Sequence, residues 1–490
     1  MSGASSAASR EAPEGAITKV ALTSLAGASI EWYDFFIYAT AAALVFPTIF
    51  FADTMPPLVA QIAAFSTFAV GFIARPVGGA VFGHFGDKVG RKKALVVALL
   101  MMGIATTMIG LLPTYAAIGF FAPLALVVLR FIQGLAIGGQ WGGAVLLATE
   151  SAPSNKRGFY GSFAQVGVPV GVILANLVFL IITAITAPEF FLAWGWRIPF
   201  LFSIALVGVG LYIQLKLEDT PAFRHLAEVK QQRDEETAQR KAREQNKSIE
   251  EVRAEIAAER QGSPVVEAFR TYPKQIALAA GAFVAVNGNF YIFISFIIAY
   301  ATNPEILGME QSTVLAAVLI ASIFQIPALL VAAAISDRLG RRGIYMAGAA
   351  LLGIWAFAFW PLVNTGSFVL IMVALIVGQA FLSMMYGPQA AFFAEIFSTK
   401  VRYSGASLGY QIGSIFGGAF APIIATALLA QFAGSSFPVS VYMAILCAVS
   451  FISVYLLTET YQTDVDDAQE SASREPNAAR GGGPSGEPVA

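Results

Sequence analysis

The sequence predicts an all-α integral membrane protein in which twelve transmembrane helices form two six-helix pseudo-repeats. Three observations lead to this fold class. The 490 residues are 57% hydrophobic and only 12% charged, with a mean hydropathy of +0.69, whereas soluble domains have about 25% charged residues. Windows of roughly 20 apolar residues, enough for a helix to cross a bilayer, recur along the chain. A short charged motif also occurs once in each half.

The motif reads GHFGDKVGRKK at residues 83–93 and SDRLGRR at residues 336–342. Each copy lies between two apolar segments, and we expect a loop in which glycine permits a tight reversal. Its acid can lie near a helix N-terminus, where negative charge is favoured. A simple positive anchor would also be basic, but the recurrence of Asp-x-x-Gly-Arg-(Lys/Arg) favours a duplicated bundle.

The chain divides into five parts in order. Residues 1–18 are predicted to be a disordered N-terminal tail, 19–217 a six-helix half, 218–273 a charged linker, 274–457 a second six-helix half and 458–490 a disordered C-terminal tail. The predicted spans are about 20–50, 59–82, 94–112, 118–148, 159–185 and 196–217 in the first half, and about 275–301, 312–335, 344–363, 367–393, 404–431 and 438–457 in the second.

Basic residues predict the orientation, because loops on the cytoplasmic side carry an excess of Lys and Arg. The loops near 52–58, 113–117, 302–311, 364–366 and 432–437 contain neither, and Arg197 is the one clear base on their side. Both termini and the linker are therefore expected in the cytoplasm. The bases that define that side are Lys19, Lys88, Arg91, Lys92, Lys93, Lys156, Arg157, Arg338, Arg341, Arg342, Lys400 and Arg402.

Composition also argues against several kinds of chemistry. The net charge of −1 gives no attraction to nucleic acid. Cys447 is the single cysteine, so an internal disulfide and a cysteine metal cluster are impossible. His84 and His225 both fall at predicted loops, and the Gly-x-x-x-x-Gly-Lys-(Ser/Thr) phosphate loop is missing. We expect no metal and no cofactor beyond a coupling proton.

Comparison of the halves points to a site between them. In the first half Glu31, Asp34, Arg75 and Arg130 lie inside apolar segments, whereas the corresponding positions of the second half are neutral. A charge at bilayer depth costs roughly 3 kcal/mol or more, so such groups usually face a cavity and pair with one another. Repeats of this kind place a substrate site at their interface near mid-membrane.

Proton coupling is predicted for Asp34 first and Glu31 second. They are three residues apart and therefore neighbours on one helix face. A desolvated carboxylate tends to hold a proton, and a nearby arginine opposes this. Arg130 would regulate proton release or bind an anionic substrate. The alternative is a permanent ion pair that only fixes helix packing.

A substrate site is predicted from arginines of one half and neutral polar residues of the other. Arginine suits a carboxylate because its planar donors contact both oxygens, although Arg75 could equally pack a gate. Each polar residue of the second half could also be an ordinary helix contact. The predicted set is Arg75, Arg130, Asn287, Asn289, Tyr291, Gln325, Gln379, Tyr386 and Gln411.

A cytoplasmic gate is predicted where acids and bases recur together at the helix ends. Breaking and remaking such pairs could bias inward and outward states, whereas static anchoring is the simpler alternative. The predicted gate comprises Asp87, Arg91, Glu150, Arg157, Asp337, Arg341, Glu395 and Arg402.

Several stretches resemble the major facilitator superfamily and, within it, the metabolite:proton symporters. The charged motif at 83–92 resembles the superfamily's loop signature. The branch is resembled by residues 31–35 (EWYDF), 75–79 (RPxGG), 130–134 (RxxQG), 156–158 (KRG), 196–200 (WRxPF), 395–397 (ExF) and 410–411 (YQ). The resemblance covers about 20–457.

This resemblance implies a secondary transporter rather than an enzyme. It implies proton-coupled symport of a small polar metabolite by a monomer in the inner membrane of a prokaryote, and an organic acid such as shikimate or α-ketoglutarate is the favoured substrate. The alternatives are import of a zwitterionic osmolyte (betaine or proline), an uncoupled facilitator, and a sensor that uses the charged linker to bind a protein.

Overall fold

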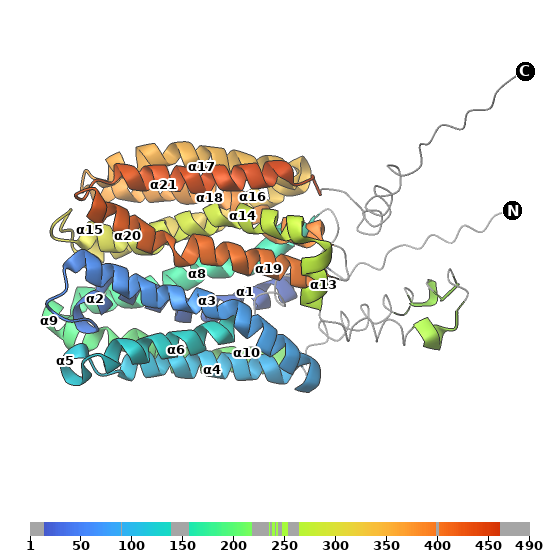
Figure 1. The fold of residues 1–490 in the computed structure, drawn as a ribbon, viewed down its shortest axis with the longest axis horizontal. Helices are drawn as coiled ribbons and strands as arrows, with labels where there is room; N and C mark the ends of the chain where they lie inside the picture. The colour runs from blue at the N-terminus through green and yellow to red at the C-terminus, as the bar shows by residue number, and fades with distance from the viewer. Residues whose placement is uncertain are drawn as a thin grey trace, which may run out of the picture.

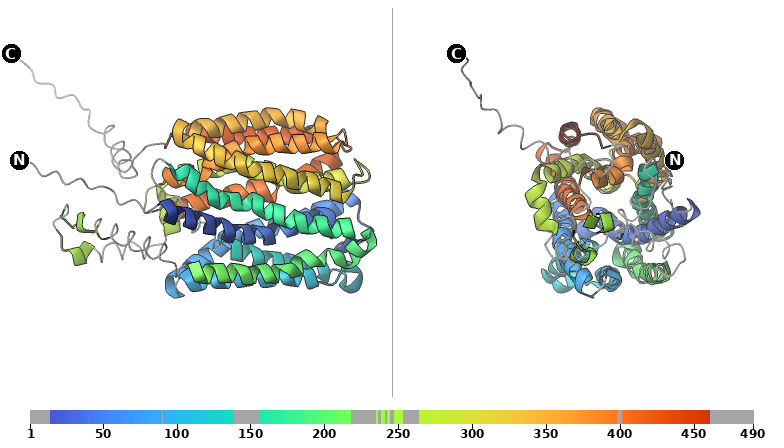
Figure 2. Two further views of the ribbon diagram at one scale, coloured as in Figure 1. Left: turned by 180° about the vertical axis from the view of Figure 1, so that it is seen from behind. Right: turned by 90° about the vertical axis from the view of Figure 1, so that its right-hand side faces the viewer.

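The computed structural model describes residues 14–89, 91–138, 156–217, 235, 238–240, 242–243, 247–252, 264–397 and 401–460. Throughout the described ranges the regular elements are helices, and the long ones run nearly parallel in a single bundle (Figure 1). Views from behind and end-on show the same packing (Figure 2). The twelve-helix architecture predicted from the apolar windows is confirmed.

Six long helices make up the first half. They are α1 (Glu14–Leu44), α3 (Pro57–Val89), α4 (Arg91–Leu111), α6 (Phe121–Gly138), α8 (Arg157–Ile185) and α10 (Arg197–Leu217). Short helical segments join them at one end of the bundle: α2 (Phe46–Ile49), α5 (Tyr115–Ile118), α9 (Pro188–Phe190) and the π-helical turn η2 (Phe191–Gly195).

The second half repeats this arrangement, but two of its six spans contain a π-helical turn. The interrupted spans are α14 (Pro273–Tyr291), η3 (Ile292–Phe296) and α15 (Ile297–Thr302), and then α19 (Arg402–Ser414), η4 (Ile415–Ala419) and α20 (Ala421–Gln431). The continuous ones are α16 (Gln311–Leu339), α17 (Arg341–Val363), α18 (Phe368–Ile396) and α21 (Phe437–Leu456). π-Helical turns inside α-helices often occur at functional sites.

Length and composition make these helices suitable for a bilayer. Nine of the described helices are long and apolar enough to cross one, or ten when α9, η2 and α10 are joined across a 46° bend. Many large apolar side chains on the outside of the bundle are exposed, among them Ile104, Ile185, Ile354 and Val369. This apolar perimeter is what a lipid environment requires.

The two repeated motifs lie at tight turns, and the helices extend further into them than the predicted spans do. Helix α3 extends to Val89 and α4 begins at Arg91, so most of the expected loop is helical. In the second half only Gly340 separates α16 from α17, with a φ of +95°. The tight reversal expected at a glycine is therefore observed at Gly340, because a positive φ is a conformation that glycine adopts readily.

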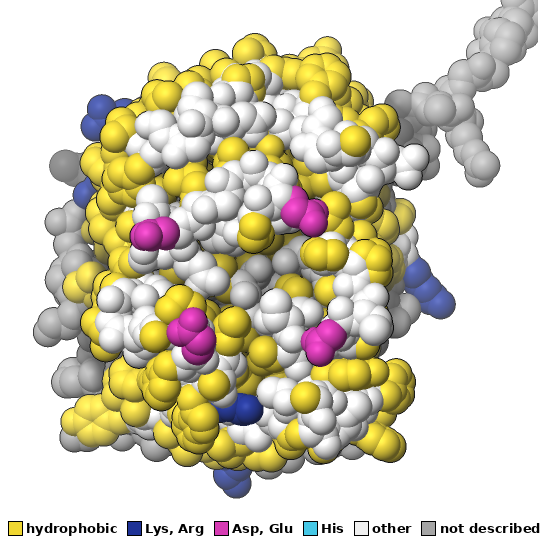
Figure 3. Space-filling model, turned by 90° about the vertical axis from the view of Figure 1, so that its left-hand side faces the viewer, with side chains coloured by type: hydrophobic (Ala, Val, Ile, Leu, Met, Phe, Trp, Pro, Cys, Tyr) yellow, Lys and Arg dark blue, Asp and Glu magenta, His cyan; other side chains and the backbone are white. Residues whose placement is uncertain are grey.

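The ends of the bundle differ chemically. One end, here called the α13 end, carries α13 (Pro264–Thr271), the start of α1 and the close of α21 (Figure 1). The other, called the α9 end, has exposed Asp53, Glu189, Glu305 and Glu310, and Figure 3 shows acidic groups spread across it. Its Arg197 is partly buried and donates hydrogen bonds to the backbone oxygens of Gly110 (2.8 Å) and Leu112 (2.7 Å).

The linker is described only in part. Residues 247–252 include a reciprocal helix cap, in which the Ser248 N–H donates to Glu251 Oε2 at 3.0 Å and the Glu251 N–H donates to Ser248 Oγ at 3.1 Å. These hydrogen bonds from Ser248 hold the pKa of Glu251 below its ordinary value.

We predict that Gly340→Ala destabilises the protein while Gly343→Ala does not. A side chain at Gly340 would be strained at φ +95° and would meet the Glu459 carboxylate at 2.8 Å, which should cost about 1–3 kcal/mol. Gly343 lies in α17 with open space around it, and alanine there should be neutral or slightly stabilising. Thermal unfolding of the purified protein in detergent measures both. Equal melting temperatures for the two variants would contradict the requirement for glycine at position 340.

Candidate functional site

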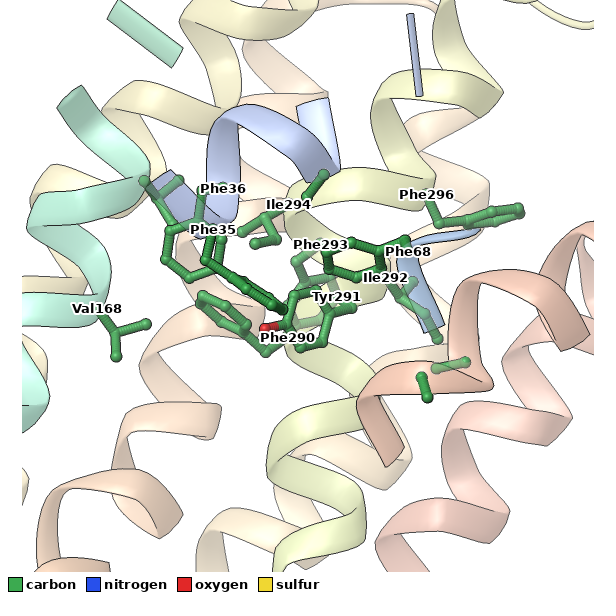
Figure 4. Packing of buried hydrophobic residues seen from close by; sticks show 14 of the residues in the cluster. Phe35, Phe36, Phe68, Val168, Phe290, Tyr291, Ile292, Phe293, Ile294 and Phe296 are labelled. Carbon is green, nitrogen blue, oxygen red and sulfur yellow. The ribbon is translucent and has the colours of Figure 1, made fainter. Parts of the chain in front are cut away.

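A cavity lies between the two halves, and its unfilled space of about 280 Å³ includes a part that is open to solvent. Helices α1 and α8 contribute one side, and α14, α18 and α19 contribute the other. Six of its ten lining side chains are aromatic. The lining residues are Trp32, Val168, Phe283, Val286, Asn287, Phe290, Tyr291, Leu382, Tyr386 and Tyr410. Figure 4 shows Phe290 and Tyr291 packed against Phe35 and Phe36, with Val168 across from them.

Arg75 of α3 lies beside this cavity and is only 1% exposed. Its guanidinium carbon stands 4.4 Å from the Phe35 ring centre, 4.5 Å from Phe72 and 5.6 Å from Trp32. The Tyr291 side chain is within hydrogen-bonding reach of the guanidinium. Nε and Nη2 of Arg75 are buried and have no hydrogen-bond partner. These two nitrogens form one edge of the planar group, which is the edge that a carboxylate can grip with both oxygens.

Arg130 of α6 is completely buried in a second aromatic group. Its guanidinium carbon lies 4.2 Å from the ring centres of Phe35 and Tyr38 and 4.7 Å from that of Phe68. Gly71 makes this possible, because a Cβ there would come within 2.6 Å of Arg130 Nε. Phe35 thus lies under both buried arginines, and such cation–π contacts are stronger where water is excluded.

Gln133, one turn further along α6, anchors Arg130. Its Oε1 accepts a hydrogen bond from Arg130 Nη1. Its Nε2 donates to the backbone oxygen of Asp34 at 3.2 Å and to Thr106 Oγ1 at 2.7 Å. The amide orientation follows from chemistry, since arginine can only donate and a carbonyl oxygen can only accept.

Asp34 of α1 lies apart from both arginines. It is fully buried, and neither carboxylate oxygen has a hydrogen-bond partner. The Ser203 hydroxyl of α10 lies close to it but donates to the backbone oxygen of Pro199 at 3.5 Å. The described residues contain no ion pair between Asp34 and Arg75 or Arg130, so the structure does not bring the predicted acids and bases into contact.

Glu31 is placed one helical turn before Asp34 and is only partly buried. The two carboxylates therefore differ in environment, although they share a helix. By solvent exposure Asp34 is the more completely buried acid of the pair.

The polar residues of the second half are all buried, but they do not form one wall. Asn287, Tyr291 and Tyr386 line the cavity, and Asn287 Nδ2 has no hydrogen-bond partner. Asn289 points elsewhere, because its Nδ2 donates to the Ala285 backbone oxygen at 2.9 Å and to Cys447 Sγ of α21 at 3.5 Å. Outside the cavity lining are also Gln325, Gln379 and Gln411, which retain unpaired buried polar atoms.

At the α13 end a carboxylate joins the halves. Asp337, on the last turn of α16, accepts hydrogen bonds from the backbone N–H groups of Gly158 (2.9 Å) and Phe159 (2.8 Å) at the start of α8. Negative charge is favoured at a helix N-terminus. Arg341 binds the same carboxylate at 2.5 Å and also reaches Glu395 at 3.4 Å.

Other predicted gate residues have less definite places. Arg157 begins α8 and is partly buried. Glu150 and the side chains of Asp87, Arg91 and Arg402 lie outside the described residues.

Sequence reasoning missed several residues of these networks. Tyr410 lines the cavity, and Gln165 of α8 donates a hydrogen bond across the interface to the Tyr386 backbone oxygen. The repeat correspondence of Gln165 with Gln411 was the signal that could have found it. Glu459 accepts from the backbone N–H groups of Arg341 and Arg342 at 3.0 Å each, and Thr460 donates to Glu395 at 2.7 Å.

The described residues include no group of three or more His, Cys, Asp or Glu that could hold a metal ion.

We predict that Asp337→Asn loosens the α13 end. Asparagine keeps one acceptor but loses the charge and the second acceptor, and charged hydrogen bonds contribute about 1.5–3 kcal/mol. Thiol labelling of Val286→Cys in a Cys447→Ser background, with reagent supplied from the α13 side, should accelerate about tenfold. Asp53→Asn at the α9 end is the control and should leave the rate unchanged. An unaltered labelling rate in Asp337→Asn would show that the Asp337 carboxylate does not hold the α13 end closed.

Twelve helical spans in two similar halves, with a largely aromatic cavity where the halves meet, are typical of solute transporters of the major facilitator superfamily. The chain belongs to the sugar (and other) transporter family, whose sequence model matches residues 19–470. It is therefore a transporter and not an enzyme, and the resemblance found in the sequence is confirmed.

Relatives are similar over nearly their full lengths. The inner membrane metabolite transport protein YhjE of Escherichia coli K12 is 40% identical over 445 residues, covering 90% of this chain and 94% of YhjE. The shikimate transporter of the same strain is 38% identical over 450 residues, covering 90% and 94%. A solved structure of the proton:xylose symporter XylE of E. coli has a TM-score of 0.70 at 16% identity, covering 94% and 99%, which shows the common fold.

Proposed function

We propose that this protein is a proton-coupled symporter that imports a small organic acid by alternating access. The observation that carries the proposal is the buried, unpaired Nε–Nη2 edge of Arg75 beside the cavity. Leaving charged donors unpaired inside a protein is costly, and a bound carboxylate would satisfy both at once. The 38% identity to a shikimate transporter supports an acid as cargo.

Charge distribution favours an anion over a zwitterionic osmolyte. None of the described side chains that line the cavity is acidic, so nothing there balances the ammonium group of betaine or proline. Two buried arginines lie close by. A positive region in a low-dielectric setting attracts anions and repels cations. Tyrosine hydroxyl groups and the free Nδ2 of Asn287 add partners for oxygen substituents.

Asp34 is the proposed proton site, with Glu31 as the secondary one. A buried carboxylate without a cation or a hydrogen-bond donor favours its protonated form. Asp34 is completely buried, with only the Ser203 hydroxyl close to its carboxylate, whereas Glu31 is partly exposed. The proton:xylose symporter with the same fold lends support to coupling. An uncoupled facilitator remains the competing function, in which Asp34 would be purely structural.

The remaining features of the proposal concern topology and gating. The bases at the α13 end favour a cytoplasmic location for that end and for both termini. Opening there would break the contact between Asp337 and α8. The protein would work as a monomer in a prokaryotic inner membrane, where YhjE is also located by its name.

Uptake into sealed vesicles with an imposed proton gradient tests the function. Shikimate, other organic acids, betaine and proline would be supplied while external pH is recorded. We expect saturable accumulation of an acid together with external alkalinisation, and Asp34→Asn should abolish the alkalinisation. Equilibration without proton movement would establish a facilitator, and accumulation of betaine or proline alone would overturn the organic-acid assignment.

Arg75→Lys tests the carboxylate site. Lysine keeps the charge but loses the paired donors, and we expect the KM for the transported acid to rise at least about tenfold, equivalent to about 1.4 kcal/mol. Arg197→Lys is a matched control, because Arg197 binds backbone oxygens at the α9 end and should not alter KM. A KM for Arg75→Lys equal to that of the unmodified protein would refute the assignment.

A further inference from the structure

Phe35 connects two cationic groups that have different surroundings. Arg75 faces the cavity side with an unpaired donor edge, and Arg130 is held in the first half by Gln133. Both guanidinium carbons lie within 4.4 Å of the Phe35 ring centre. Two positive charges on buried side chains around one ring repel each other more strongly than they would in water. The Phe35 ring therefore interacts with both guanidinium charges.

From Arg130 the contacts continue to the helix segment that carries Asp34. Gln133 accepts from Arg130 and donates to the Asp34 backbone oxygen. Both ends of this amide are occupied, so a displacement of Arg130 pulls on α1 at the proposed proton site. The continuous chain of contacts runs through Arg75, Phe35, Arg130, Gln133 and Asp34.

We infer that this chain couples anion binding to proton binding, with Phe35 and Gln133 as positioning residues that touch neither the substrate nor the proton. The inference rests on the proposed function. An anion on Arg75 neutralises one of two repelling cations, which lets Arg130 settle closer to Phe35. Gln133 then shifts the α1 backbone, and the change favours a proton on Asp34. Substrate and proton thus bind cooperatively, as symport requires.

Few ionisable groups lie on the elements around Asp34, so a change at the arginines can affect its protonation. On α1 itself these are Glu31, Tyr33 and Tyr38. The elements in contact with α1 add Arg75 of α3, Arg130 of α6, Tyr291 of α14 and Tyr300 of α15. The described ionisable residues of α4, α8 and α10 are confined to the outer parts of those helices, namely Lys93, Arg157, Tyr160, Arg197 and Tyr212. The arginines are the charged groups nearest the middle of the bundle.

A test without substrate is available, because Arg75→Gln mimics the neutralised arginine. Infrared titration of the purified protein would follow the carboxylic-acid band that disappears in Asp34→Asn. We expect Arg75→Gln to raise the titration midpoint by about 0.7–2 pH units, which corresponds to the usual 5- to 150-fold coupling between sites. The same substitution made in Gln133→Leu or Phe35→Leu should move the midpoint by less than a third of that amount.

Two matched controls distinguish the loss of this chain of contacts from a general disruption of the packing. Thr106→Val removes the hydroxyl that accepts a hydrogen bond from Gln133 Nε2, and it leaves the contacts from Arg75 to Asp34 intact. Phe36→Leu removes a neighbouring buried ring that stacks on Trp32 at 5.2 Å and lies over neither arginine among the described contacts. Both controls should retain the full shift caused by Arg75→Gln.

The outcomes are distinct. A shift of full size in the Gln133→Leu and Phe35→Leu backgrounds would overturn the inference, since a direct electrostatic field would then suffice. The absence of any shift in Arg75→Gln would overturn it as well. A missing Asp34 band would instead refute the proton site on which the inference rests, whereas failure of the vesicles to accumulate acids would refute the proposed substrate and leave the coupling measurable.

Discussion

Two buried arginines without a carboxylate partner are the constraint on which the centre of this protein depends. Arg75 and Arg130 are both no more than 1% exposed, and a charge in such a place is normally paired. Here aromatic rings take the place of the missing acid. Phe35, Phe68, Phe72 and Tyr38 give these cations π faces at 4.2–4.7 Å. Such contacts offset only part of the desolvation cost, and the bound anion of the proposed function would offset more of it.

The internal repeat shows how this asymmetry arises. Asp34 lies beside Ser203 of α10, the last helix of its half, and Asn289 binds Cys447 of α21, the last helix of the other half. The two positions are therefore equivalent in space as well as in sequence. One carries an ionisable group and the other a neutral amide with its own partners. The same scaffold thus carries a titratable residue in one half and a neutral amide in the other.

The sequence predicted the fold well because hydrophobic length is a strong local signal. Each of the twelve predicted spans overlaps an observed helix or interrupted helix, while the predicted end at 148 lies outside the described residues. The arrangement of the site was less predictable. Spacing placed Asp34 on the same helix as Phe35, yet the two side chains face different neighbours, α10 for one and α3 with α6 for the other. Rotation of a helix within a bundle depends on tertiary packing, and an almost uniformly apolar helix carries little information about it.

The closures of the cavity use different interactions at its two ends. At the α13 end, Asp337 and the N-terminus of α8 contribute charged hydrogen bonds between the halves. Towards the α9 end the halves meet through a neutral hydrogen bond, from Ser295 Oγ to the Ala39 backbone oxygen at 3.1 Å, and through apolar packing of α1 on η3 and α15. Charged groups regain hydration when they separate, whereas apolar surfaces lose stabilisation when water enters. Charged hydrogen bonds therefore oppose opening at the α13 end, whereas apolar packing opposes opening at the α9 end. A change of charge in the cavity can tilt that balance, since it alters the hydration and electrostatics of the charged end more than those of the apolar one.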